Sequence, residues 1–329
     1  MSTYPLLCLA AQYSLQVYNR PSSPKPSTTI DNIERYIPPS LRLGTKAMVL
    51  KLHPDDTSNT LVLAIRGSQT FMDWAVNFRP SPSSPSGFLD DPGNLVHSGF
   101  LAVARAMIRP IVARLQELVI ENPSRRRASL LITGHSAGGA VASLLYMHMT
   151  SQASGVTSEL KTLAGEFKRV HCVTFGAPPV SLLPLQKREG VRGLEKSLFF
   201  GFANEGDPVV RADRGYVKSL VRLYACAPLA EKGSEGERVG EGERREKWEV
   251  PENQLSCAGR LVLLRGMDSG AGAGGKSKGS GGGTGKVEAF WTSDEELRGV
   301  VFGDPMMHRM EVYKRRVEAL AVGAVTAGG

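Results

Sequence analysis

Apolar residues recur along the chain with two different spacings, and each spacing predicts one kind of secondary structure. Helical spacing predicts helices over residues 6–18, 100–122, 138–149, 294–300 and 308–320. Short apolar runs predict strands over residues 47–52, 61–65, 129–133, 170–175, 198–202 and 260–265. Because strands alternate with long helices, we expect the α/β class, with a mostly parallel central sheet and helices on both faces.

Segments rich in proline, serine, glycine or charge separate these elements. Residues 20–40 and 80–94 are predicted loops. Residues 231–247 are almost all charged or glycine, and residues 270–285 hold nine of the 36 glycines. Neither of these two segments can bury enough apolar surface to offset its ordering entropy. We therefore expect one domain over residues 1–329 with two flexible surface insertions.

The composition is that of an ordinary globular protein, with 329 residues, 41% hydrophobic and 22% charged. No apolar run approaches the ~20 residues that span a bilayer, and the absence of Lys or Arg before Arg20 makes a poor signal peptide. These features predict a cytoplasmic protein. The four cysteines lie far apart without a CxxC pair, which favours reduced thiols over metal ligands; they are Cys8, Cys172, Cys226 and Cys257.

The net charge of +8 is dispersed along the chain. Its densest clusters, residues 125–127 and 314–316, are not interleaved with the aromatic residues that a base-stacking site requires. Solvated helix ends and loops therefore explain the charge better than a nucleic-acid partner. A weak peripheral attraction to anionic membranes or a lipid-droplet surface stays open.

One phosphate-loop pattern is rejected on its context. Gly270, Gly275, Lys276 and Ser277 satisfy G-x-x-x-x-G-K-[ST], but a phosphate loop must run directly into a helix. Here more glycine follows, so we expect no nucleotide partner.

The pattern G-x-S-x-G at residues 134–138 carries the strongest chemical signal. An apolar strand precedes it and a helix of small residues follows, which is the setting of a nucleophile elbow. The sharp turn would lift the Ser136 hydroxyl clear of the sheet, and the two flanking glycines would avoid collisions with neighbouring backbone. Ser136 is therefore the predicted nucleophile.

A serine nucleophile needs a general base and an acid that orients it, in the chain order Ser, Asp or Glu, His. His308 is the only histidine beyond a strand-terminal acid, since His171 lies within a predicted strand and His148 within the helix after Ser136. The acid candidate is Asp207, at the end of a predicted strand. Asp213 is its competitor, and Asp304 has the alternative role of a helix cap.

Five segments together resemble the class 3 lipases, the fungal lipase-like α/β-hydrolases. They are LVLAIRGSQTFMDWAVNF, LVHSGFLAVA, LLITGHSAGGAVASLL, VTFGAPPV and NEGDPVVRAD. The resemblance implies an α/β-hydrolase fold, with Ser136 as nucleophile and Asp207 rather than Asp213 as triad acid. It also implies an oxyanion hole formed by the backbone N–H groups of Ser68 and Ala137.

The C-terminal part departs from this family pattern at one position. The family usually has an aspartate before the triad histidine, whereas Met307 precedes His308 here. The segments GRLVLLR and DPMMHRMEVY are most similar to the intracellular diacylglycerol-lipase-like branch.

An apolar stripe follows the predicted oxyanion residue. Phe71, Trp74 and Phe78 recur at the spacing of one helical face. The resemblance implies a lid over the active site, and the alternative is an ordinary core helix. His97, in VHSGF, is interpreted as a structural hydrogen-bonding histidine.

Together these features predict a serine-dependent hydrolase of carboxylic esters, with glycerolipid acyl esters as the substrate class and no cofactor or metal. An acyltransferase on the same scaffold and a catalytically silent interaction module are the alternatives.

Overall fold

The computed structural model describes residues 3–19, 34–37, 48–52, 59–67, 82–225, 254–267 and 286–326. The two predicted insertions, residues 231–247 and 270–285, lie outside the described residues. The same holds for most of the predicted loop over residues 20–40, although residues 34–37 of it form a strand rather than a loop.

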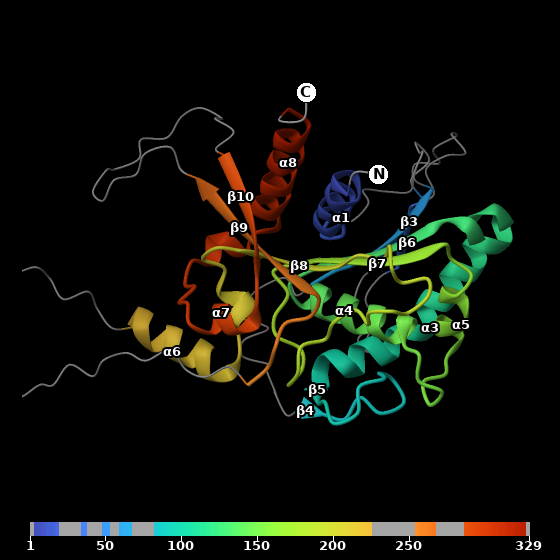
Figure 1. Cartoon of the computed structure of the whole chain (residues 1–329), viewed down its shortest axis with the longest axis horizontal. Coiled ribbons are helices and arrows are strands. Elements are labelled where there is room, and N and C mark those ends of the chain that lie inside the picture. The colour runs from blue at the N-terminus through green and yellow to red at the C-terminus, as the bar shows by residue number, and fades with distance from the viewer. Residues whose placement is uncertain are drawn as a thin grey trace, which may run out of the picture.

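The described strands form one eight-stranded sheet and a separate two-stranded pair (Figure 1). The large sheet has the order β1-β2-β3-β6-β7-β8-β9-β10, and the pair is β4-β5. Neighbours from β3 to β9 run parallel, whereas the pairs β1/β2, β2/β3 and β9/β10 are antiparallel. The strands are β1 (Glu34–Ile37), β2 (Met48–Leu52), β3 (Thr60–Ile65), β4 (Pro82–Ser83), β5 (Val96–His97), β6 (Ser129–His135), β7 (Arg169–Phe175), β8 (Phe199–Asn204), β9 (Arg260–Met267) and β10 (Lys286–Thr292).

Helices cover both faces of the large sheet (Figure 1). One face carries α3 (Ser98–Glu121), α4 (Ala137–Thr150) and α5 (Glu159–Ala164), and the other carries α1 (Tyr4–Gln16) and α8 (Met310–Thr326). The remaining helices are α6 (Arg214–Ala225), α7 (Asp294–Arg298) and three 3-10 turns, η1 (Pro123–Arg127), η2 (Pro208–Arg211) and η3 (Pro305–His308). The predicted mostly parallel α/β architecture is confirmed.

The alternation of side chains along β3 shows how one strand serves two cores. Leu61, Leu63 and Ile65 pack with α3 and α4, while Val62 and Ala64 pack with α1 and α8. A parallel strand covered on both faces is apolar throughout, and all six residues of β3 are buried.

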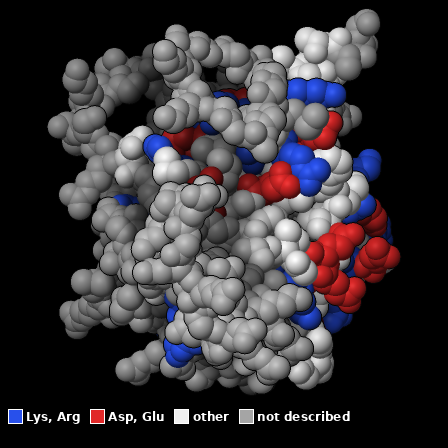
Figure 2. All heavy atoms as spheres, turned by 90° about the vertical axis from the view of Figure 1, so that its left-hand side faces the viewer, with Lys and Arg blue, Asp and Glu red and all other residues white. Residues whose placement is uncertain are grey.

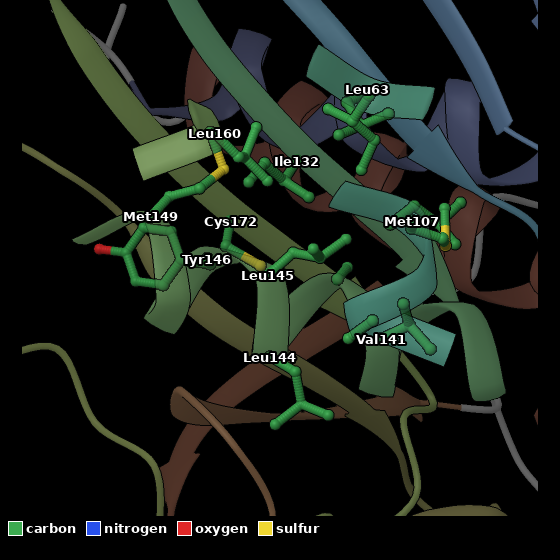
Figure 3. Close-up of a cluster of buried hydrophobic side chains, with 14 of the residues drawn as sticks. Leu63, Met107, Ile132, Val141, Leu144, Leu145, Tyr146, Met149, Leu160 and Cys172 are labelled. Atoms are coloured by element: carbon green, nitrogen blue, oxygen red, sulfur yellow. The ribbon is translucent and has the colours of Figure 1, made fainter. Parts of the chain in front are cut away.

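The larger core lies between the sheet and helices α3 to α5 (Figure 3). Leu63, Ile132 and Cys172, from three adjacent strands, meet Met107 of α3 and Leu145 of α4, and none of the five is measurably exposed. Burying a side chain of this size contributes ~1.5–3 kcal/mol. This core fixes the position of α4, and therefore of the turn from which α4 starts.

Strand β10 is the last strand of the sheet and is largely exposed. The Arg260 guanidinium lies 3.7 Å from the centroid of the Trp291 ring, and the Arg265 guanidinium lies 5.3 Å from that of Phe290. Arg265 also makes a bidentate contact with Glu205, with a shortest distance of 2.8 Å. The sequence analysis did not predict β10, α5 or α6.

Residues of both predicted basic clusters make hydrogen bonds or ion pairs within the protein. Arg125 donates to the Leu118 carbonyl over 2.9 Å at the end of α3, Arg126 pairs with Glu166, and Lys314 pairs with Glu318. On the face shown in Figure 2, described acidic and basic side chains occur side by side. None of the described helices combines the length and apolar character that crossing a bilayer requires.

Candidate active site

The turn from β6 into α4 holds Ser136 in a conformation that few residues other than glycine adopt. Its φ is 58° and its ψ is −135°, and the Ser136 N–H donates to the Phe175 carbonyl over 2.9 Å. A Cβ at Gly134 would lie 2.6 Å from the carbonyl carbon of Gly138, and one at Gly138 would meet backbone of residues 65–67. These contacts explain both glycines of the predicted nucleophile elbow.

Asp207 follows β8 in a tight turn and is fully buried. Its Oδ2 accepts hydrogen bonds from His308 Nδ1 over 2.9 Å and from the Tyr313 hydroxyl over 2.6 Å. Its Oδ1 accepts from the Val209 N–H over 2.8 Å. Because the carboxylate only accepts, the His308 proton resides on Nδ1, which leaves Nε2 as the proton acceptor.

The Asp207–His308 pair lies at the same end of the sheet as the elbow. Gly176, with a φ of 54°, follows β7 directly, and a Cβ there would lie 2.8 Å from Asp207 Oδ2 and 3.0 Å from His308 Nδ1. The residue before it, Phe175, accepts the Ser136 N–H. The carboxyl ends of β6, β7 and β8 thus bring Ser136 and the acid–base pair together, which is where open α/β sheets bind their ligands.

The two other candidate acids have structural contacts. The Asp213 oxygens accept from the backbone N–H groups of Tyr216 and Gln254, over 2.9 and 3.0 Å. Asp304 caps η3 through the Met306 N–H. The structure therefore gives His308 to Asp207 and not to either competitor.

The histidines of β5, α4 and β7 are buried and make structural hydrogen bonds. His97 caps α3 by accepting from the Phe100 N–H, in agreement with its interpretation as a structural residue. His148 contacts the Phe88 carbonyl and the Ser158 hydroxyl, and His171 accepts from the Leu198 N–H. Burial lowers the pKa of His97 and of His171 to about 4.

Two further residues contact the site, and the sequence analysis gave neither of them a role. Tyr313 donates to Asp207 and accepts from the Asn204 N–H over 2.8 Å, and desolvation by burial raises the pKa of its phenol well above 10. His135 contacts the His308 carbonyl through Nε2 over 2.7 Å and the Tyr18 hydroxyl through Nδ1 over 3.0 Å. His135 directly precedes the predicted nucleophile, which was the only signal available for it.

Of the two predicted oxyanion-hole residues, Ala137 lies among the described residues and Ser68 does not. Ala137 is the first residue of α4 and is buried, so its N–H is at the helix N-terminus beside Ser136. Ser68 lies outside the described residues, but Gly67 is described, and a Cβ there would lie 3.2 Å from the Ser136 Cβ. The predicted lid residues Phe71, Trp74 and Phe78 also lie outside the described part of the chain.

The described residues contain no group of three or more His, Cys, Asp or Glu side chains placed to hold a metal ion. Every polar side chain of the site is instead accounted for by an elbow serine, an imidazole–carboxylate pair and their hydrogen-bond partners. The sheet, with its parallel centre and helices on both faces, has the α/β-hydrolase fold.

Comparison with known proteins agrees with that fold. Residues 62–214 match the family described as lipase (class 3). A secreted mono- and diacylglycerol lipase A of Penicillium cyclopium is 34% identical over 177 residues, which is 53% of this chain and 50% of the relative. The chloroplastic phospholipase A(1) DAD1 of Arabidopsis thaliana is 30% identical over 134 residues, covering 36% of this chain and 27% of the relative. The match to the class 3 lipase model over residues 62–214 agrees with the resemblance found in the sequence.

Solved structures confirm the fold. A triacylglycerol lipase described as having a serine protease triad as its catalytic centre matches with a TM-score of 0.54 at 16% identity, covering 92% of both chains. Lipase II from Rhizopus niveus matches with a TM-score of 0.53 at 15% identity, covering 93% of this chain and 92% of the other. The chain spans half or less of the length of the curated relatives it matches.

Proposed function

We propose that this protein is a serine-dependent carboxylic ester hydrolase that acts on acyl esters of glycerolipids. The observation that carries the proposal is the hydrogen-bonded pair of Asp207 and His308 at the elbow that holds Ser136. The names of the relatives, which include mono- and diacylglycerol lipase and phospholipase A(1), support the substrate class. The diacylglycerol-lipase-like branch stays a prediction within that class.

The geometry supports a two-step acyl transfer to water. Ser136 Oγ attacks the ester carbonyl while His308 Nε2 takes its proton, and Asp207 stabilises the resulting imidazolium. The Ala137 and Ser68 N–H groups would bind the oxyanion, and one such donor is worth ~2.7–4 kcal/mol. His308 then returns its proton to the leaving alcohol and, as a base, activates the water that releases the acid.

Labelling with a fluorophosphonate probe tests the nucleophile and the base together. Wild-type protein should be labelled at Ser136 and should hydrolyse a short soluble ester and a diacylglycerol. Ser136→Ala should lose labelling and turnover, and His308→Ala should lose turnover by orders of magnitude. His171→Gln, which keeps an acceptor for the Leu198 N–H, is the matched control and should keep wild-type kcat.

Product analysis separates hydrolysis from acyl transfer. With an alcohol added to the aqueous assay, a hydrolase yields mainly free acid, whereas an acyltransferase yields mainly the new ester. A wild-type protein that is folded, unlabelled and inactive on every ester would instead indicate the silent interaction module.

We also propose a cytoplasmic location with peripheral contact to a lipid surface. The described cysteines Cys8, Cys172 and Cys257 are free thiols, which suits a reducing compartment. Exposed apolar side chains occur on α6, just before η3 and within η3; they include Val221, Tyr224, Val301 and Met306. Flotation with phosphatidylcholine vesicles with and without phosphatidylserine tests the contact, and cell fractionation tests the location.

A further inference from the structure

The hydroxyl of Tyr18 joins two segments that are far apart in sequence. Tyr18 lies in the turn that follows α1, and its Oη lies close to Gly67 and contacts His135 Nδ1 over 3.0 Å. A Cβ at Gly67 would lie 2.5 Å from this oxygen, so the backbone there passes close against the tyrosine. The contact is therefore built on a glycine that leaves space for the hydroxyl.

The two partners of His135 determine which atom donates and which accepts in each of its two hydrogen bonds. The His308 carbonyl only accepts, so His135 Nε2 carries the proton that bonds it over 2.7 Å. Complete burial lowers the pKa of His135 well below 6.5, so the ring is neutral and Nδ1 is an acceptor. The Tyr18 hydroxyl must therefore donate to Nδ1, and burial raises the pKa of Tyr18 to about 12, which keeps that proton in place.

The contacts of Tyr18 and His135 reach three backbone segments, and each segment carries or precedes a residue of the proposed active site. Gly67 precedes Ser68, the predicted oxyanion residue, and His135 precedes Ser136. The third segment is the turn that carries His308, which His135 holds by its carbonyl.

Tyr18 has a rigid support. Its helix α1 is pinned to β6 by a buried hydrogen bond of 2.8 Å between the Ser14 and Thr133 hydroxyls, and Thr133 lies three residues before Ser136. On its other side α1 packs against Tyr313 and Val317 of α8. The hydroxyl is therefore fixed relative to the elbow and to the helix that follows His308.

We propose that Tyr18, acting through His135, is a positioning residue that holds the oxyanion segment, the nucleophile turn and the turn of His308 in one fixed arrangement. This inference rests on the proposed ester-hydrolase function. A displacement of reacting groups by about 1 Å can cost on the order of a hundredfold in rate, so loss of the hydroxyl should appear in kcat.

The decisive variant is Tyr18→Phe, which removes only the hydroxyl. We expect kcat on a soluble p-nitrophenyl ester to fall at least tenfold, with KM within twofold, and labelling of Ser136 by a fluorophosphonate to slow by a similar factor. The matched control is Tyr146→Phe, because the buried Tyr146 hydroxyl has no hydrogen-bond partner among the described residues. That control should leave kcat and the labelling rate unchanged.

A second pair of variants tests the same contacts from β6, should Tyr18→Phe fail to fold. His135→Gln keeps a side-chain N–H for the His308 carbonyl and should retain more kcat than His135→Leu, which keeps none. In wild-type protein, ¹⁵N-histidine NMR should show His135 neutral at pH 6 with its proton on Nε2.

The outcomes separate this inference from the proposed function. Wild-type kcat in folded Tyr18→Phe, or a His135 proton on Nδ1, overturns the positioning role while the ester hydrolase stands. A wild-type protein that neither hydrolyses esters nor reacts at Ser136 overturns the proposed function, and the positioning role with it.

Discussion

The two faces of the sheet are built from different kinds of side chains. Between the sheet and α3 to α5, most members of the core are aliphatic, and Leu145 lies among other apolar side chains there (Figure 3). On the α1 and α8 face, the core includes Tyr13, Phe175, Phe202 and Tyr313, and α8 reaches into the candidate site.

Further polar contacts of the second face lie beside Asp207, the candidate acid. Arg316 of α8 donates to the Asn204 side chain over 3.0 Å and to the Leu264 carbonyl over 2.9 Å, and Asn204 in turn donates to the Met307 carbonyl. Asn204 lies three residues before Asp207. From this difference we expect the first face to act mainly through stability, by holding α4 and the turn at its start, and the second face to position Asp207 and His308. Four predictions test this division.

The largest effect is expected at the acid itself. Asp207→Asn should lower kcat about 10⁴-fold, because the amide cannot stabilise the His308 imidazolium and favours the wrong tautomer. Steady-state kinetics on a soluble ester measure this effect. Asp213→Asn is the matched control, and we expect it to lower Tm while kcat per folded molecule stays within a few-fold. A large loss of kcat in Asp213→Asn, with little loss in Asp207→Asn, would show that Asp213 is the acid and that Asp207 is not.

The next effect concerns the first face alone. Leu145→Ala should reduce the free energy of unfolding by about 2–5 kcal/mol, since it leaves a cavity among fully buried side chains. Urea unfolding measures the loss, and kcat measured well below the new Tm should remain that of the wild type. A loss of kcat comparable with that of a site variant would break the division between the faces.

A smaller effect is expected from the second face. Tyr313→Phe removes one donor from Asp207 and leaves the Asn204 N–H without its acceptor. A hydrogen bond to a charged group is worth ~1.5–3 kcal/mol, so kcat should fall by roughly ten- to a hundredfold with little change in KM. If Tyr313→Phe instead lowers the free energy of unfolding while kcat per folded molecule stays that of the wild type, Tyr313 has only a packing role.

The smallest effect is a loss of folding stability at acidic pH, which we expect from His97 on the first face. His97 caps α3 with a pKa lowered to about 4, whereas its unfolded value is near 6.5. Between these values the unfolded chain binds a proton that the folded protein does not. Stability is therefore complete above pH 6.5 and falls as the pH drops towards 4.

Replacing the cap with a side chain that does not titrate isolates this effect. His97→Asn keeps a good capping acceptor and should make the loss of stability between pH 7 and pH 5 smaller by up to about 2 kcal/mol. Chemical denaturation at the two pH values measures it. An unchanged pH dependence in the variant would show that other groups cause the loss of stability.

Local patterns were sufficient to predict the elements that carry the candidate nucleophile and the candidate acid. An apolar strand, a G-x-S-x-G turn and a helix of small residues are all contiguous, so Ser136 could be placed without tertiary information. His308 followed by elimination, and the structure brings it to Asp207 across 101 positions of sequence. The family was recognisable for the same reason, because its motifs are short and local.

The features that were missed are tertiary or lack a clear periodicity. The contact between Tyr18 and His135 spans 117 positions, and nothing near either residue in sequence announces the other. Strand β10 has charged residues at alternate positions in its first half and is largely exposed, so its apolar run is only three residues long. Helix α6 has four of its twelve residues basic or glycine at its start and middle, which masked its apolar stripe.

The arginines over the rings of β10 have a consequence for how the molecule behaves at high concentration. A sheet that ends in an aromatic-rich strand presents unpaired backbone groups on which a strand of another molecule could assemble. Arg260 and Arg265, on the neighbouring strand β9, place positive charge over the rings of Trp291 and Phe290, which stay 54% and 41% exposed. Charge beside an exposed outer strand is one of the ways in which proteins oppose edge-to-edge association, so we expect these two arginines to favour separate molecules at high protein concentration.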